Sequence, residues 1–130
     1  MISTLTRSPD DIGLHICGTW EIEAPTYNDE HIVYVFTGDS FTSVTESMIF
    51  GADAAVLEDI AEFLLLYSGA IVDAEDMGDG NFRMRITAGG TFALDGNRIR
   101  LVSGEGLVRV LSFSWESEAI FIDGYRFTRR

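Results

Sequence analysis

The sequence contains no lysine and only one cysteine. All nine basic side chains are arginines, which excludes chemistry that needs a Schiff-base lysine or a P-loop lysine. Cys17 has no second cysteine with which to form an intramolecular disulfide, as is typical of proteins from reducing compartments. No run approaches the roughly 20 apolar residues of a membrane span, and residues 1–14 lack the apolar stretch of a signal peptide. We therefore expect a cytoplasmic protein.

Positive charge is also scarce, because the formal net charge is -12 and the isoelectric point is about 4.3. Phosphate backbones and anionic lipid headgroups bind through Lys and Arg, so we expect no nucleic acid and no membrane as partners. The 130 residues are 46% hydrophobic and contain two prolines, which indicates one globular domain spanning residues 1–130. No pattern specifies the oligomeric state.

Short runs rich in β-branched and aromatic residues dominate the chain, with glycine-containing turns between them. Turn signals stand at 37–40 (TGDS), 77–81 (MGDGN), 88–90 (AGG), 94–98 (LDGNR), 103–106 (SGEG) and 115–118 (WESE). They predict strands near 15–24, 31–37, 41–50, 70–75, 82–88, 91–95, 98–103, 107–115 and 119–128. Closing consecutive hairpins into a barrel removes exposed edges, so we predict an all-β, up-and-down antiparallel barrel of eight to nine strands.

One segment departs from the strand pattern, at about residues 53–67. Apolar residues recur there at helical spacing opposite acidic ones, which predicts a single inserted amphipathic helix. They are Val56, Leu57, Ile60, Phe63, Leu64 and Tyr67. Asp53 is suited to cap its start, and Gly69 its end. Two roles stay open for this helix: it plugs or packs on the barrel, or it forms a mobile lid over a ligand mouth.

Four segments in order along the chain resemble the calycins, specifically small bacterial lipocalin-like domains. They are CGTW at 17–20, YVFTGDSF at 34–41, GTFALDGNRIRLV at 90–102 and YRFTRR at 125–130. The resemblance implies that Trp20 closes the barrel floor beneath an arginine of the last strand, among Arg126, Arg129 and Arg130, for which we take Arg129. It also implies a cavity for a small, mostly apolar molecule.

Alternation along the strands predicts which side chains face the lumen. Ile32, Tyr34 and Phe36 form one face, whereas Arg83, Arg85, Arg98 and Arg100 point to solvent. Arg109 shares a face with Leu107, Leu111, Phe113 and Trp115, which places a guanidinium on the apolar side. We expect it to anchor an anionic or carbonyl-bearing ligand. Two alternatives stay open: Val108 and Val110 face inward instead, or Arg109 pairs with Glu46.

Motifs for metal or nucleophilic chemistry are sparse. His15 and His31 with Cys17 do not form a convincing metal set, the acidic run from Asp73 lacks oxygen ligands at Met77 and Met84, and no serine lies in a G-x-S-x-G motif. We expect no metal and no cofactor.

Three functions follow as hypotheses, and the third is a structural or partner-binding domain that makes its contact through the exposed face of the helix. The first is a barrel that binds a small apolar ligand with Arg109 as its anchor. Its walls would be Tyr34, Phe36, Phe41, Met84, Phe113 and Trp115. The second is a cofactor-free cyclase or isomerase that folds a flexible apolar substrate, with Tyr34 and Arg109 as catalytic residues.

Overall fold

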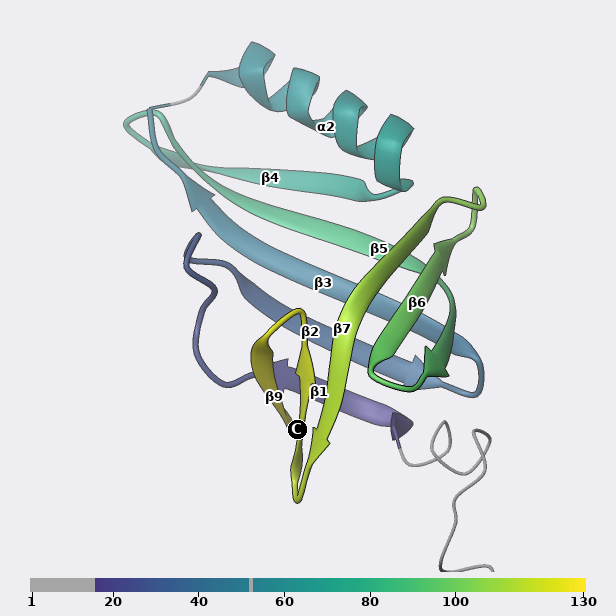
Figure 1. Cartoon of the computed structure of the whole chain (residues 1–130). Coiled ribbons are helices and arrows are strands. Elements are labelled where there is room, and N and C mark those ends of the chain that lie inside the picture. Colours follow the sequence, from purple (N-terminus) through teal and green to yellow (C-terminus); the bar gives the residue numbers. More distant parts are fainter. Residues whose placement is uncertain (1–15, 52) are drawn as a thin grey trace, which may run out of the picture.

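The computed structural model describes residues 16–51 and 53–130, which form nine antiparallel strands and one complete helix (Figure 1). The strands are β1 (Gly18–Ile22), β2 (His31–Thr37), β3 (Ser40–Ile49), β4 (Ile71–Gly78), β5 (Asn81–Asp95), β6 (Arg98–Ser103), β7 (Val108–Glu116), β8 (Ala119–Ile122) and β9 (Tyr125–Arg129). Neighbouring strands pair in the order β3-β2-β1-β9-β8-β7-β6-β5, and β3 also pairs with β5. The result is the predicted closed barrel, with eight strands in the wall and β4 as an extra strand outside it.

Strand β5 is longer than predicted and joins two parts of the molecule. Residues 82–91 of β5 pair with β3, residues 81–87 also pair with β4, and residues 90–95 pair with β6. The prediction of a turn at residues 88–90 was wrong, because Gly89 and Gly90 lie within a continuous strand. A Cβ added at Gly90 would meet the Val102 carbonyl group, so glycine at this position allows a close approach of two strands.

The end of the chain differs from prediction in the opposite way. Residues 119–128 form two strands, β8 and β9, where a single strand was expected. Asp123 and Gly124 both have positive φ, 55° and 84°, and make the two-residue turn of a hairpin in which Ile122 pairs with Tyr125. An Asp-Gly pair is a strong hairpin signal, so the sequence contained the information.

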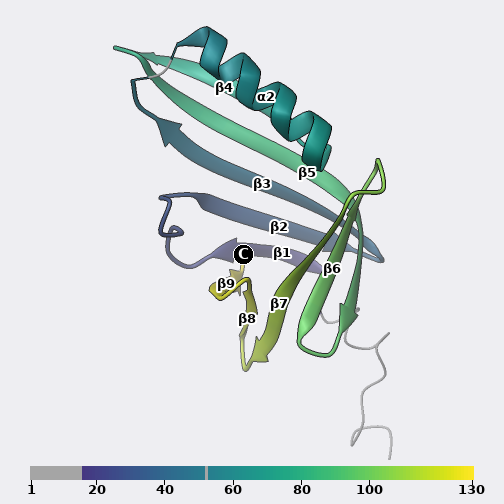
Figure 2. The ribbon, with the colours of Figure 1, turned by 45° about the horizontal axis from the view of Figure 1, so that its top comes forward.

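The predicted helix is present as α2 (Ala54–Ser68), and both predicted caps are confirmed. The Asp53 side chain accepts a hydrogen bond from the Val56 amide at 3.0 Å, and Gly69 ends the helix in the left-handed conformation with φ 67°. Helix α2 packs against β4, outside the barrel wall (Figures 1 and 2).

The hydrophobic core packs inside the barrel. The end of the barrel at Trp20 is here called the narrow end, and the end at the loop of residues 26–30 is called the wide end. The core residues share the inward face of the strands: Ile16, Trp20, Ile22, Tyr34, Phe36, Phe41, Phe92, Ile99, Leu101, Phe113, Ile120, Ile122 and Phe127. The predicted inward faces of β2 and β6 are confirmed, and Arg83, Arg85, Arg98 and Arg100 are exposed as expected. Five of these residues also line the pocket described below, so the site lies directly on the core: Tyr34, Phe41, Leu101, Ile122 and Phe127.

Candidate ligand-binding site

A pocket of about 470 Å³ opens above the core, on the side of the barrel where α2 lies. Its walls come from the loop at residues 26–30 and from inward-facing residues of β2, β3, β5, β6, β7, β8 and β9. Leu64 and Ala70, at the end of α2 and just after it, complete the wall. Helix α2 therefore contributes to the pocket as part of its side and does not fill the lumen.

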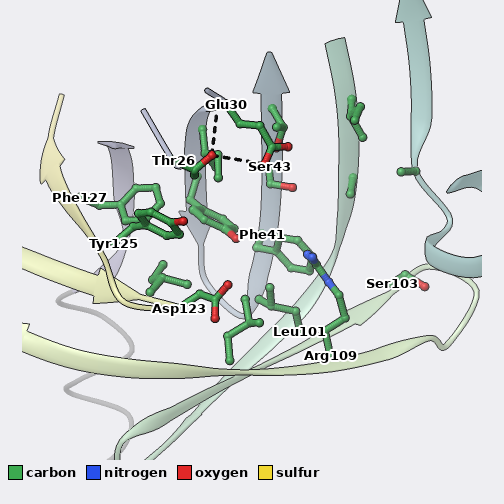
Figure 3. Close-up of a pocket in the computed structure, with 18 of the residues that line it drawn as sticks. Thr26, Glu30, Phe41, Ser43, Leu101, Ser103, Arg109, Asp123, Tyr125 and Phe127 are labelled. Atoms are coloured by element: carbon green, nitrogen blue, oxygen red, sulfur yellow. Dashed lines mark hydrogen bonds between the residues drawn. The ribbon is translucent and has the colours of Figure 1, made fainter. Parts of the chain in front are cut away.

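Arg109 points into this pocket from β7 (Figure 3). In the β6–β7 ladder it lies opposite Leu101, which is 1% exposed, and cross-strand partners share a face of the sheet. Val108 and Val110 do not face inward, since they are 48% and 53% exposed and Val110 pairs with the exposed Arg100. Arg109 is itself an exposed residue, as the same alternative expected. Among the described residues no ion pair joins Arg109 to Glu46. The guanidinium thus lies at an apolar cavity and is reachable from solvent.

Tyr34 lies next to Arg109 in the pocket wall and is only 5% exposed. Burial raises the pKa of its phenol above the usual 10.0, and this is the largest effect on it. The Arg109 guanidinium acts in the opposite direction, by its charge and as a hydrogen-bond donor, whereas the carboxylate of Asp123 raises the pKa further. The phenol is therefore neutral at physiological pH and lies within the fields of one cation and one anion.

The opposite side of the pocket carries hydroxyl and carboxylate groups (Figure 3). Thr26 and Ser43 are buried, at 7% and 6% exposure. The Thr26 hydroxyl accepts a hydrogen bond from the Glu30 amide at 3.2 Å and lies 3.4 Å from a carboxylate oxygen of Glu30. Asp123, in the β8–β9 turn, also lines the pocket. The cavity consequently carries one arginine and two carboxylates, those of Glu30 and Asp123, together with aliphatic and aromatic surface.

Three of the predicted site residues meet in this pocket: Tyr34, Phe41 and Arg109. The structure places the others away from its walls. Phe36 and Phe113 belong to the packed core below it, at 1% and 3% exposure. Met84 is buried on β5, in register with Ser47 of β3 and Ala74 of β4.

Trp115 lies at the narrow end of the barrel and is 42% exposed. Its ring makes edge-to-face contacts with Trp20 and Phe113, at centroid distances of 6.4 and 5.6 Å. Alternation correctly put Trp115 on the inward face of β7. Alternation does not specify how far along the barrel axis a residue lies. Trp115 was therefore expected among the ligand contacts, although it lies at the other end of the barrel from the pocket.

Trp20 and Arg129 lie together at this narrow end. The Arg129 guanidinium carbon is 4.4 Å from the centre of the Trp20 ring, and its Nη1 donates a hydrogen bond to the Cys17 carbonyl at 2.8 Å. The indole Nε1 donates to the Ile16 carbonyl at 2.6 Å. Gly18 has φ 133°, and a Cβ added there would lie 2.7 Å from Arg129 Nη1, so the glycine leaves room for the arginine to cross.

Sequence reasoning missed the polar residues that reach the pocket from loops, namely Thr26, Glu30 and Asp123. Strand alternation says nothing about loop side chains, and only the Asp-Gly turn signal could have drawn attention to Asp123. Leu64 was recognised as part of the helix's apolar face, but not as part of a pocket.

No metal centre is formed within the part of the chain that the structure describes, since no three His, Cys, Asp or Glu side chains come together there. His31 pairs with Glu21 on the outer surface, with 2.8 Å between Nε2 and Oε2. His15 lies outside the described residues.

No protein-family model matches the chain, and no curated protein matches it in sequence. The structure is similar to the crystal structure of a lipoprotein YedD from Klebsiella pneumoniae subsp. pneumoniae, with 10% sequence identity and a TM-score of 0.48. The match covers 88% of this chain and 71% of that one. Within residues 16–51 and 53–130, no helix is long and apolar enough to cross a membrane.

Proposed function

We propose that the protein binds a small, mostly apolar molecule in the pocket at the wide end of the barrel, with Arg109 holding an acidic or carbonyl oxygen of the ligand. The observation that carries the proposal is the position of a guanidinium at a cavity of about 470 Å³ whose walls are largely aliphatic and aromatic. A binding site with apolar walls and a few convergent polar groups has this composition. The contact between Trp20 and Arg129 supports placing the chain among calycin-like barrels, in which such a cavity is expected.

The polar groups suggest how the ligand would lie. An oxygen acceptor would sit beside the Arg109 guanidinium and the Tyr34 hydroxyl, both of which can donate to it. The apolar body would then contact Phe41, Leu101 and Leu111. Because Glu30 and Asp123 also line the pocket, the acidic group of the ligand must avoid these two carboxylates.

Decanoate and 1-decanol are suitable probes, because they share an apolar chain and differ in the group that would face Arg109. Isothermal titration calorimetry should show decanoate binding more tightly than decanol by about tenfold, since a charge-assisted hydrogen bond adds about 1.5 kcal/mol or more. Arg109→Leu should remove this difference. Arg100→Leu removes the same charge from an exposed outward position and should leave binding unchanged. Absence of binding by both probes and by larger apolar acids would contradict the proposal.

A second candidate function is favoured by the Tyr34 and Arg109 pair. A neutral phenol beside a guanidinium at the wall of a pocket could polarise a carbonyl and stabilise charge that develops on it, as a cofactor-free cyclase or isomerase requires. A linear polyene that ends in a 1,3-dicarbonyl is the test substrate. Conversion would give a product of unchanged mass and altered NMR spectrum. Tyr34→Phe should slow it by about tenfold or more with little change in substrate binding. Binding without conversion leaves the first function alone.

A further inference from the structure

Residues 53–79, here called the α2–β4 insertion, lie outside the closed barrel. They comprise the Asp53 cap, α2, β4 and the start of the turn that leads into β5. The barrel closes through the pairing of β3 with β5, and β4 pairs with β5 alone among the described strands. Figures 1 and 2 show both elements at one side of the wide end. Barrel closure therefore does not require the insertion, and its outer surface calls for a separate explanation.

That outer surface is apolar to an unusual degree. Helix α2 uses Leu57, which is 7% exposed, and Leu64 to pack inward. Leu65 and Leu66 nevertheless remain 55% and 71% exposed, and Ile71 at the start of β4 is 63% exposed. A surface helix normally turns polar residues toward solvent, whereas a helix that is apolar on several sides is normally covered.

The charged groups of the insertion itself are all carboxylates, of which Glu75 on β4 pairs with Arg83 of β5 at 3.9 Å. The insertion carries eight of the chain's 21 carboxylates and none of its nine arginines. On the helix, Glu58, Asp59 and Glu62 are all exposed. Asp59, Glu62 and Leu66 are spaced three and four residues apart, so they lie along one side of the helix. The surface thus combines leucine with carboxylate and offers no cation of its own.

We propose that the α2–β4 insertion docks a basic amphipathic segment of a partner protein. Leucines of the insertion would pack against the apolar face of that segment, and Glu58, Asp59 and Glu62 would face its Lys or Arg side chains. Charge complementarity selects this occupant. Two copies of the chain meeting at this surface would bring like charges together, and an anionic lipid surface would be repelled for the same reason.

The probe is a synthetic peptide of about 18 residues, or five helical turns, built from leucine and lysine so that the leucines share one helical face. Its partner in the comparison has the same composition in an order that forms no apolar face. Fluorescence anisotropy at physiological salt should show the patterned peptide binding about tenfold more tightly than the scrambled one. Equal binding would overturn the proposal, because it would reduce the interaction to net charge.

Two variants with matched controls locate the surface. The double variant with Leu65→Gln and Leu66→Gln keeps helix-forming residues and should weaken peptide binding by about tenfold. Val35→Gln changes a 37% exposed valine of the barrel wall and should leave peptide binding unchanged.

Neutralising Glu58, Asp59 and Glu62 as amides should weaken binding severalfold. Neutralising the exposed Asp39, Asp95 and Glu118 removes the same charge elsewhere and should have a smaller effect.

A dimer in sedimentation velocity that the double leucine variant dissociates would overturn the proposal in favour of a second copy. Binding to neutral phosphatidylcholine vesicles that requires these leucines would overturn it in favour of a lipid surface.

Discussion

Removing the Arg129 side chain should destabilise the barrel at its narrow end. The cation–π contact with Trp20 contributes about 0.5–1 kcal/mol at an exposed position. The charged hydrogen bond to the Cys17 carbonyl contributes about 1 kcal/mol when solvent competes for it. Trp20 is 2% exposed, and uncovering about 40 Å² of its ring costs about 1 kcal/mol more. We therefore expect Arg129→Ala to lower the free energy of unfolding by about 2–3 kcal/mol.

Urea denaturation followed by tryptophan fluorescence measures this loss, and Arg130→Ala provides the control. Arg130 is also a terminal arginine, but its side chain is 59% exposed and its ion pair with Glu21 spans 4.0 Å, so its loss should cost about 0.5 kcal/mol or less. Gly18→Ala adds a second test, because its new Cβ would collide with Arg129 Nη1. Part of the Gly18→Ala cost should disappear in the Arg129→Ala background. Equal costs for the two arginines, together with an unchanged Gly18→Ala cost, would refute the reasoning.

Three further predictions concern other parts of the fold. Burial raises the pKa of Tyr34 above 10.0, so the stability that its neutral phenol contributes is complete below that pH and is lost as the pH rises through the folded-state pKa. Tyr34→Phe should therefore flatten the fall of the unfolding free energy at alkaline pH, measured by denaturation from about pH 8 to about pH 11. Gly90→Ala should cost about 2–3 kcal/mol, because its Cβ meets the backbone of Val102, and should exceed the cost of Gly89→Ala, whose Cβ would lie 3.2 Å from a carbonyl oxygen. A similar loss for both glycine variants would contradict the tight approach at Gly90. Asp53→Ala removes the N-cap of α2 and should lower the unfolding free energy by about 1 kcal/mol. Asp53→Asn can still accept the hydrogen bond from the Val56 amide and should retain most of that stability. An unchanged unfolding free energy for Asp53→Ala would mean that the cap contributes nothing.

Local patterns predicted most of the architecture. Gly38, Gly80 and Gly96 lie in the expected turns with positive φ, and Asp53 and Gly69 cap the helix as expected. These features depend on a few neighbouring residues, so a short stretch of sequence specifies them. The wrong predictions at residues 88–90 and 119–128 have one cause, because a glycine in the sequence is compatible with two structures. The chain reverses direction at Gly124, whereas at Gly90 it continues as a strand that passes close to its neighbour.

The candidate site was only partly accessible to the same reasoning. Alternation put Tyr34 and Arg109 on the inward face, and the structure joins them in one pocket with Phe41. It also put Phe36 and Phe113 on that face, where they belong to the packed core. Facing inward is a property of the strand, whereas depth along the barrel depends on strand tilt and register, which involve residues far apart in the chain.

The sequence by itself determined the nature of the elements: antiparallel strands with alternating faces, a capped helix between the third and fourth strands, an acidic surface without lysine, and an arginine on an apolar face. Only the tertiary structure decided that the pocket opens beside the loop at residues 26–30, that β4 lies outside the closed wall, and that Asp123 and Glu30 share this pocket with Arg109. Turn, cap and face preferences arise from interactions over a few residues. The position of the cavity arises from the pairing of β3 with β5 and of β1 with β9, which joins parts of the chain that no local pattern relates.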